Sequence, residues 1–149
     1  MDRMILIDGV IITPLNIIPH EKGDIFHAMR VDSPGYVGFG EAYFSTIKFG
    51  EIKAWKKHFK MTLNLIVPIG EVKFVLYDDR ENSKTNKIFN EIILSKENYN
   101  RLTIPHEIWM GFKGLAKSDN IILNIANYVH DPEEQVNKGI HEIGIHIDW

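Results

Sequence analysis

The sequence contains no cysteine, so disulfides, thiolate metal ligands and a cysteine nucleophile are all excluded. It also has no apolar stretch close to the roughly 20 residues that a membrane-spanning helix needs. The first residues do not form a signal peptide, because Asp8, Gly9 and Pro14 interrupt their apolar runs. The net charge of -3 gives no overall attraction to nucleic acid or to an anionic membrane. We therefore expect a cytoplasmic protein whose partners include neither nucleic acid nor a membrane.

Common catalytic and cofactor-binding motifs are missing as well. The sequence has no G-x-S-x-G nucleophile elbow, no G-x-x-x-x-G-K phosphate loop and no G-x-G-x-x-G dinucleotide fingerprint. None of its seven histidines forms the H-x-H pair of metal-binding jelly rolls, and that spacing reads Lys56-Lys57-His58 instead. A protonated lysine repels a cation and does not ligate it. We therefore expect neither a bound metal nor a cofactor.

Short β-rich runs separated by turn residues make up most of the chain. Their length and spacing are typical of a sandwich or barrel of mostly antiparallel strands. The expected strands are 5–12, 25–31, 36–47, 52–67, 71–77, 87–94, 101–104, 109–115, 121–128 and 140–147. One helical turn is expected at 132–137, with Asp131 as its N-cap and Pro132 in the first helical position. No linker or repeat divides the chain, so we predict a single all-β domain over residues 1–149.

The stretch from Gly50 to Arg80 is the most informative part of the sequence. Its first run alternates between two faces, as the side chains of a strand do. The polar face carries Lys56, His58, Lys60, Thr62 and Asn64, and the apolar face carries Trp55, Phe59, Met61, Leu63, Leu65 and Val67. Two interpretations of the polar face are equally open, a solvated surface or the cationic wall of a pocket for a phosphorylated ligand. Trp55 and Trp109 offer flat surfaces near such a pocket.

The order of several short segments resembles a known family. These segments are Lys22-Gly23, Tyr43-Phe44-Ser45, Gly50-Glu51-Ile52-Lys53, Gly70-Glu71-Val72, Asp78-Asp79-Arg80 with Ser83 and Thr85, Leu94-Ser95 with Asn98, Leu102 with Ile104-Pro105, Gly111-Phe112, and Tyr128 with Pro132-Glu133-Glu134. In this order they resemble the dTDP-4-dehydrorhamnose 3,5-epimerases and the related nucleotide-sugar 3,4-ketoisomerases. The resemblance implies a cupin-type jelly roll, a nucleotide-diphosphate sugar as the partner, a role in surface polysaccharide biosynthesis, and a homodimer.

The chain departs from this family at catalytic positions. The general-base histidine of the family falls on Lys56, an arginine falls on Lys53, and the histidine of its HGF motif falls on Met110. The late aspartate that pairs with the base histidine lies beyond Trp149. The pocket tyrosine is kept at Tyr128, and His58 matches one of the two histidines of the ketoisomerases.

The implied substrate is a nucleotide-linked 4-keto-6-deoxy sugar, whose ketone acidifies the hydrogens at C3 and C5. Its chemistry needs a base, an acid on the opposite wall, and positive charge near the enolate oxygen. Lys56 would need its pKa lowered by about 3 units to act as a base at neutral pH, whereas a histidine needs no shift. We therefore predict His58 as the base, Tyr128 as the acid, and Lys56 as the charge that stabilises the enolate.

Five further residues are predicted to contact the substrate. They are Lys22, Lys53, Lys60, Asn64 and Trp109, with Lys22 holding a phosphate at the mouth of the pocket. Lys53 has the opposite strand parity to Lys56, so a bulge is needed for both to face inward. The alternative prediction, which the loss of the usual base supports, is a catalytically silent jelly roll that binds a nucleotide sugar or glycan.

Overall fold

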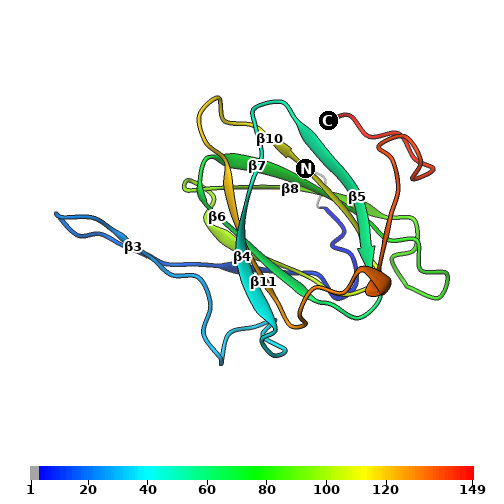
Figure 1. Cartoon of the computed structure of the whole chain (residues 1–149), viewed down its shortest axis with the longest axis horizontal. Coiled ribbons are helices and arrows are strands. Elements are labelled where there is room, and N and C mark those ends of the chain that lie inside the picture. The colour runs from blue at the N-terminus through cyan, green and yellow to red at the C-terminus, as the bar shows by residue number, and fades with distance from the viewer. Residues whose placement is uncertain (1–3) are drawn as a thin grey trace.

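The computed structural model describes residues 4–149 and shows two five-stranded antiparallel sheets that face each other (Figure 1). The first sheet has the order β1 (Ile11–Pro14), β9 (Asn100–Ile104), β6 (Leu63–Ile69), β11 (Ile121–Ala126) and β4 (Glu41–Thr46). The second has the order β12 (Gln135–Asn137), β5 (Ile52–His58), β10 (Trp109–Gly114), β7 (Glu71–Tyr77) and β8 (Phe89–Ser95). A separate hairpin of β2 (Ile17–Ile18) and β3 (Ile25–Phe26) projects from the body as an arm. The predicted all-β sandwich is confirmed.

The main core fills the space between the two sheets. Alternate residues of β6 and β7 point into it, among them Leu65, Val67, Val72 and Phe74, which are almost fully buried. This alternation is what a strand with one buried face requires. Within the described residues, no helix is long and apolar enough to cross a membrane.

The expected strand over 52–67 is wrong, because the chain reverses after His58. Phe59 donates its amide hydrogen to the backbone oxygen of Glu134 over 2.8 Å, and Thr62 donates to Asn127 Oδ1 over 2.8 Å. These partners occupy the amides that strand pairing would have used, so β5 ends at His58 and β6 begins at Leu63. The polar face of β5 and the apolar face of β6 consequently both point to the inside of the sandwich.

The expected strand over 140–147 is also wrong. This segment runs irregularly across the outer face of β5 and β10, where it buries a second apolar cluster that includes Trp55, Trp109 and Ile143. Trp55 donates from Nε1 to the backbone oxygen of Ile140 over 3.0 Å, and its ring lies 5.3 Å from that of Trp149. The alternating sequence therefore covers a sheet face and does not extend a sheet edge.

Other boundaries shift in smaller ways. The strands expected over 5–12, 25–31 and 36–47 are observed as β1, β3 and β4, and are later or shorter than predicted. The expected turn after Asp131 is confirmed as a single 3-10 turn, η1 (Pro132–Glu134), in which Asp131 Oδ1 accepts from the Glu133 amide over 3.0 Å. The residues that follow it form β12.

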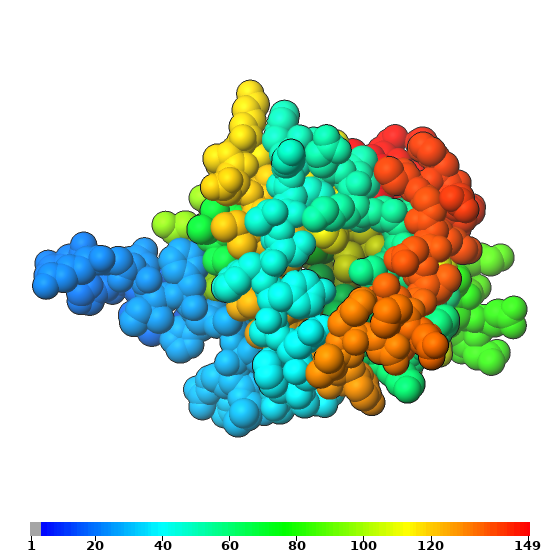
Figure 2. Space-filling model, viewed as in Figure 1, coloured from blue at the N-terminus to red at the C-terminus, as the bar shows by residue number. Residues whose placement is uncertain are grey.

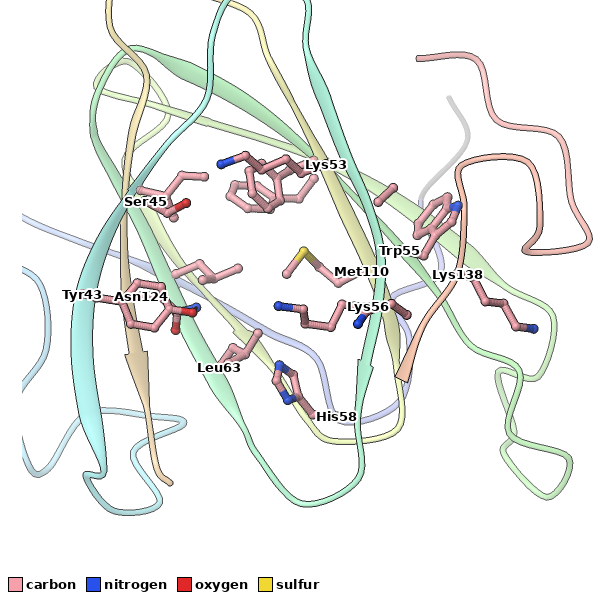
Figure 3. A pocket seen from close by; sticks show the side chains of 16 residues that line it. Tyr43, Ser45, Lys53, Trp55, Lys56, His58, Leu63, Met110, Asn124 and Lys138 are labelled. Atoms are coloured by element: carbon pink, nitrogen blue, oxygen red, sulfur yellow. The ribbon is translucent and has the colours of Figure 1, made fainter. Parts of the chain in front are cut away.

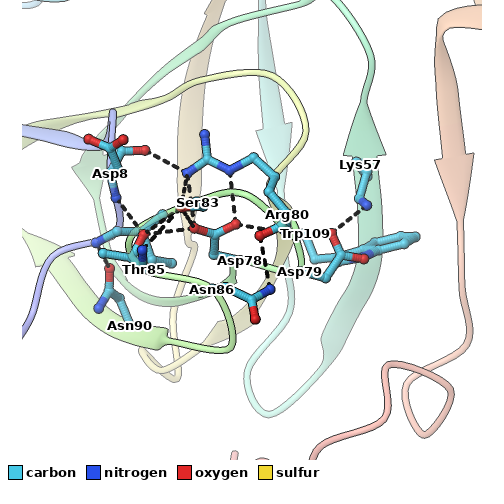
Figure 4. A network of polar contacts seen from close by, with 11 residues as sticks. Asp8, Lys57, Asp78, Asp79, Arg80, Ser83, Thr85, Asn86, Asn90 and Trp109 are labelled. Carbon is cyan, nitrogen blue, oxygen red and sulfur yellow. Dashed lines mark hydrogen bonds and ion pairs between the residues drawn. The ribbon is translucent and has the colours of Figure 1, made fainter.

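The segment that joins β7 to β8 is held by a buried carboxylate (Figure 4). Asp78 is fully buried and accepts from Arg80 Nε at 2.9 Å, Ser83 Oγ at 2.6 Å and Thr85 Oγ1 at 2.7 Å. Burial alone would raise the pKa of Asp78, but these donors outweigh it and hold the pKa far below its usual value. Arg80 also donates to the backbone oxygen of Asp8 over 2.8 Å, so the network ties the N-terminal segment to the sandwich.

Candidate functional site

A cavity of about 460 Å³ opens between the two sheets. One wall comes from β5 and β10, the other from β4 and β11, and β6 contributes the apolar residues Leu63 and Leu65 (Figure 3). In the space-filling view the molecule is hollowed beside β4 (Figure 2). Four polar side chains carry the chemistry of the lining, namely His58 and Lys56 on one wall and Tyr43 and Asn124 on the other.

His58 stands at the end of β5 and is paired with a buried carboxylate. Its Nδ1 contacts Oε1 of Glu134, whose side chain is only 5% exposed. The second oxygen of Glu134 accepts from the backbone amides of Lys60 at 3.1 Å and Met61 at 3.2 Å. With both carboxylate oxygens occupied, Glu134 is fixed in place and orients the imidazole so that Nε2 is left for a ligand.

The surroundings lower the pKa values of both members of this pair, but for different reasons. Burial lowers the pKa of His58, and the hydrogen bond and charge of Glu134 oppose this effect only in part. Burial by itself would raise the pKa of Glu134, but the donors from His58, Lys60 and Met61 outweigh it and lower the pKa. At neutral pH the imidazole is therefore neutral and the carboxylate is ionised, which is the protonation state that a general base requires.

Lys56 and Lys53 both line the cavity, although they have opposite strand parity. The pairing of β10 with β5 shows why, because Met110 is opposite Lys56 while Phe112 is opposite Lys53. Three steps along β5 therefore match two steps along β10, which is a β-bulge. Lys53 is held by donation from Nζ to the backbone oxygen of Thr46 over 2.7 Å, and its charge lies 5.9 Å from the ring centre of Phe112.

Tyr43 and Asn124 form the polar part of the opposite wall. They are directly paired residues of β4 and β11, and Asn124 Nδ2 donates to the phenol oxygen of Tyr43 over 2.9 Å. Burial and the charge of Glu41 raise the pKa of Tyr43, against a smaller lowering effect of Asn124. The phenol is therefore protonated at neutral pH and is able to donate a proton.

The structure brings together three of the residues predicted from the sequence, His58, Lys56 and Lys53, around the cavity. The remaining five lie outside its lining. Tyr128 follows the end of β11 and is 47% exposed, while Lys22 lies in the projecting arm and Lys60 in the exposed turn after β5.

Asn64 and Trp109 are buried on the outer faces of the two sheets. Asn64 Nδ2 donates to the backbone oxygen of Gly35 over 3.1 Å, and Asn64 Oδ1 accepts from Thr103 Oγ1 over 2.6 Å. Trp109 Nε1 donates to Asp79 Oδ2 over 2.8 Å, and Lys57 Nζ lies 4.7 Å from the centre of its ring. Both side chains are therefore fully engaged in contacts within the fold.

The sequence analysis gave no role in the site to Glu134, Tyr43 or Asn124. Glu134 is 76 positions from His58, so local spacing gives no sign of the pairing, which depends on β12 pairing with β5. Two weaker signals were available. Asn124 is a lone polar residue in an apolar run of β11. Tyr43 and Phe44 are consecutive residues of a strand and therefore lie on opposite faces, as Lys56 and Trp55 do.

Among residues 4–149, no group of three or more His, Asp or Glu side chains is placed to hold a metal ion. The polar groups that line the cavity include the imidazole of His58 with its carboxylate partner, the phenol of Tyr43, and the ammonium groups of Lys53 and Lys56. This set is suited to moving protons next to an anionic or carbonyl-bearing ligand.

Comparison with known proteins identifies similar chains, although no family model matches the sequence. A crystal structure of a dTDP sugar isomerase from Desulfovibrio desulfuricans is 34% identical, with a TM-score of 0.89 over 91% of this chain and 87% of that one. A spore coat polysaccharide biosynthesis protein from Bacillus subtilis is 29% identical over 91% of this chain and 89% of its own length. A probable epimerase of low-salt glycan biosynthesis from Haloferax volcanii is 25% identical over 86% and 83%, respectively.

Proposed function

This chain belongs to the family of dTDP-sugar isomerases and epimerases with a cupin-type jelly roll, and we propose that it isomerises or epimerises a nucleotide-linked 4-keto-6-deoxy sugar. The product would serve the synthesis of a surface polysaccharide. The observation that carries the proposal is the buried His58–Glu134 pair. His58 faces the protonated phenol of Tyr43 across one cavity (Figure 3). A base and an acid on opposite walls are what proton transfer at a carbon next to a ketone requires.

The reaction would begin when Nε2 of His58 removes a proton from a carbon next to the ketone. The electron pair of that C–H bond moves into the new enolate, and the ionised Glu134 stabilises the imidazolium that forms. Lys56 is two residues from His58 on the same strand and lines the same cavity, so its charge favours the negative enolate oxygen. Reprotonation at the same or a neighbouring atom completes an epimerisation or a keto shift.

We assign the opposing acid to Tyr43 in preference to Tyr128. Tyr43 lines the cavity and is held by Asn124, whereas Tyr128 lies outside the lining at the rim of the first sheet. A proton donor has to come within hydrogen-bond distance of the atom that it protonates. The position of Tyr43 on the wall opposite His58 supports this role.

The alternative of a catalytically silent binding protein loses its main argument. It was based on the absence of the usual base and its carboxylate partner at the expected positions. His58 and Glu134 supply an equivalent pair from β5 and η1, with the base two positions further along the strand. We therefore retain the enzyme as the proposed function.

A direct test is incubation with nucleotide-linked 4-keto-6-deoxyhexoses in D₂O, followed by NMR of the sugar ring. The dTDP-linked sugar is the first choice, and the UDP-, GDP- and CDP-linked sugars complete the panel. The proposal predicts deuterium at a carbon next to the ketone and a new isomer with at least one of them. No deuterium and no new isomer with any of the four would refute it.

The proposal also includes a cytoplasmic homodimer. The arm of β2 and β3 projects away from the body (Figure 1), and the edge strand β4 exposes 70% of Phe44. An exposed edge with a large apolar side chain favours association. In such a dimer the arm of one copy would reach the other, where Lys22 could contact a phosphate. Light scattering that shows only monomer would contradict the dimer, and cell fractionation tests the location.

A further inference from the structure

Asn124 presents an unsatisfied hydrogen-bond acceptor to the cavity. Its side chain is only 6% exposed, and it lines the cavity. Its Nδ2 donates to Tyr43, but among the described residues Oδ1 has no hydrogen-bond partner. A buried amide oxygen without a partner costs about 1–3 kcal/mol in an otherwise satisfied interior, so a partner supplied by a ligand would remove this cost.

The neighbours of Asn124 explain why no protein group satisfies this oxygen. In the sheet, Asn124 is opposite Tyr43 on one side and Leu65 on the other. The residues that share its face of β11 are Ile122 and Ala126, both buried and apolar. Leucine, isoleucine and alanine side chains have no hydrogen-bond donor. Tyr43, the one neighbour with a donor, accepts from Nδ2 of Asn124, so the contents of the cavity are the remaining source of a donor for Oδ1.

The same contact fixes the direction of the Tyr43 hydroxyl. A phenol oxygen has one hydrogen to donate and can also accept. Because it accepts from Asn124 Nδ2, its own hydrogen remains available for the cavity. The register of β4 and β11 holds the two residues opposite each other, so this direction is built into the fold.

We propose that Asn124 reads a sugar hydroxyl through Oδ1 and keeps Tyr43 as a donor toward the carbon that is protonated. The wall then presents a donor and an acceptor side by side. Its ligand is a keto sugar with a free hydroxyl on the reacting carbon or on its neighbour, which for reaction at C3 means the hydroxyl of C3 or C2. This inference rests on the proposed function, because it uses the same cavity and the same acid.

Two substitutions separate the two roles of Asn124. Asn124→Leu has a similar size but neither donor nor acceptor. Asn124→Asp keeps an acceptor for the sugar, but its carboxylate accepts the hydrogen of Tyr43 and removes it from the cavity. Asn82→Asp makes the same change on an exposed loop and is the matched control.

The first measurement is binding by calorimetry in a His58→Asn background, in which the sugar is not consumed. The ligands are dTDP-4-keto-6-deoxyglucose and its 2-deoxy and 3-deoxy analogues. With Asn124 intact, one of the analogues should bind about tenfold more weakly than the parent, and Asn124→Asp should keep this discrimination. Asn124→Leu should lose it. Equal discrimination with Asn124→Leu, or none with Asn124 intact, would overturn the inference.

The second measurement is deuterium incorporation with His58 restored. Asn124→Asp should lower the rate by about 100-fold, toward that of Tyr43→Phe, and the two changes together should be no worse than Tyr43→Phe alone. Additive losses would overturn the role of Asn124 in directing Tyr43. A wild type that incorporates no deuterium contradicts the proposed function, whereas an Asn124→Asp variant as fast as wild type contradicts only this inference.

Discussion

Replacing Glu134 with glutamine tests the pair on which the proposed chemistry depends. Glu134 accepts from His58 through one oxygen and from the amides of Lys60 and Met61 through the other. Glutamine has a single side-chain oxygen. If this oxygen stays on the two amides, the NH₂ group faces Nδ1 of His58, and the imidazole proton moves to Nε2. The nitrogen that faces the substrate is then no longer a base.

The size of the effect follows from the lost charge. Two unit charges about 4 Å apart attract by about 4 kcal/mol at an effective dielectric constant near 20. The imidazolium that forms during the reaction loses this attraction in Glu134→Gln, which corresponds to about a 1000-fold lower rate. If water compensates for half of it, the loss is about 2 kcal/mol, or about 30-fold. We therefore expect kcat to fall between about 30- and 1000-fold.

The pH profile provides a second and independent sign of this role. His58 acts as a base only when neutral, so kcat/KM falls as the pH decreases through its pKa. Burial already places this pKa below the usual 6.5, and Glu134 is the partner that raises it. Removing the carboxylate lowers the pKa further, so the acid limb of the residual activity should move to lower pH.

The assay is deuterium incorporation next to the ketone, measured by NMR as a function of pH. Glu133→Gln is the matched control, because it removes the same charge from the neighbouring exposed residue. It should leave both the rate and the acid limb unchanged. A Glu134→Gln enzyme within a factor of about three of wild type, with an unshifted acid limb, would refute the reasoning.

Three other predictions address the remaining parts of the site and the fold. In steady-state kinetics, Tyr43→Phe should lower kcat by about 100-fold or more, while Tyr128→Phe should change kcat little. A larger loss with Tyr128→Phe than with Tyr43→Phe would restore Tyr128 as the acid. Lys56→Met should lower kcat by about 10- to 1000-fold, because the enolate loses a stabilising charge. It should also move the acid limb of kcat/KM to higher pH, because the charge of Lys56 lowers the pKa of His58. An acid limb that stays in place would show that the two residues do not interact. Asp78→Ala should cost about 3–5 kcal/mol in urea unfolding. The contribution of Asp78 should be complete above its unfolded pKa near 3.9 and be lost as the pH falls below it, since the folded pKa is depressed; a variant as stable as wild type would contradict this.

Sequence reasoning placed His58, the proposed base, in the cavity, but misjudged the strand that carries it. His58 was chosen because a histidine needs no pKa shift to act near neutral pH, and it does line the cavity. The alternation that pointed to it was extended through Asn64, whereas β5 ends at His58. The turn that follows is fixed by Glu134 and Asn127, both distant in the sequence. Alternation within one run cannot show such long-range contacts.

The need for a bulge at Lys53 was predicted correctly, because strand parity is a local property of the sequence. The opposing wall could not be assigned in the same way. Tyr128 was favoured by its place in the family pattern, but β11 ends at Ala126 and leaves Tyr128 at the rim. Tyr43 becomes visible only when the register of β4 against β11 places it opposite Asn124. The choice of Tyr43 as the proposed acid therefore depends on strand pairing.

The most direct test of the central claim, that His58 removes a proton next to the ketone, compares wild type with His58→Asn by NMR in D₂O. Both proteins are given the same nucleotide-linked 4-keto-6-deoxyhexose, and circular dichroism confirms that the variant is folded. Wild type should incorporate deuterium next to the ketone, and His58→Asn should incorporate it at least 1000-fold more slowly, on the order of the loss when a catalytic base is removed. A folded His58→Asn variant that exchanges at the wild-type rate would contradict the account.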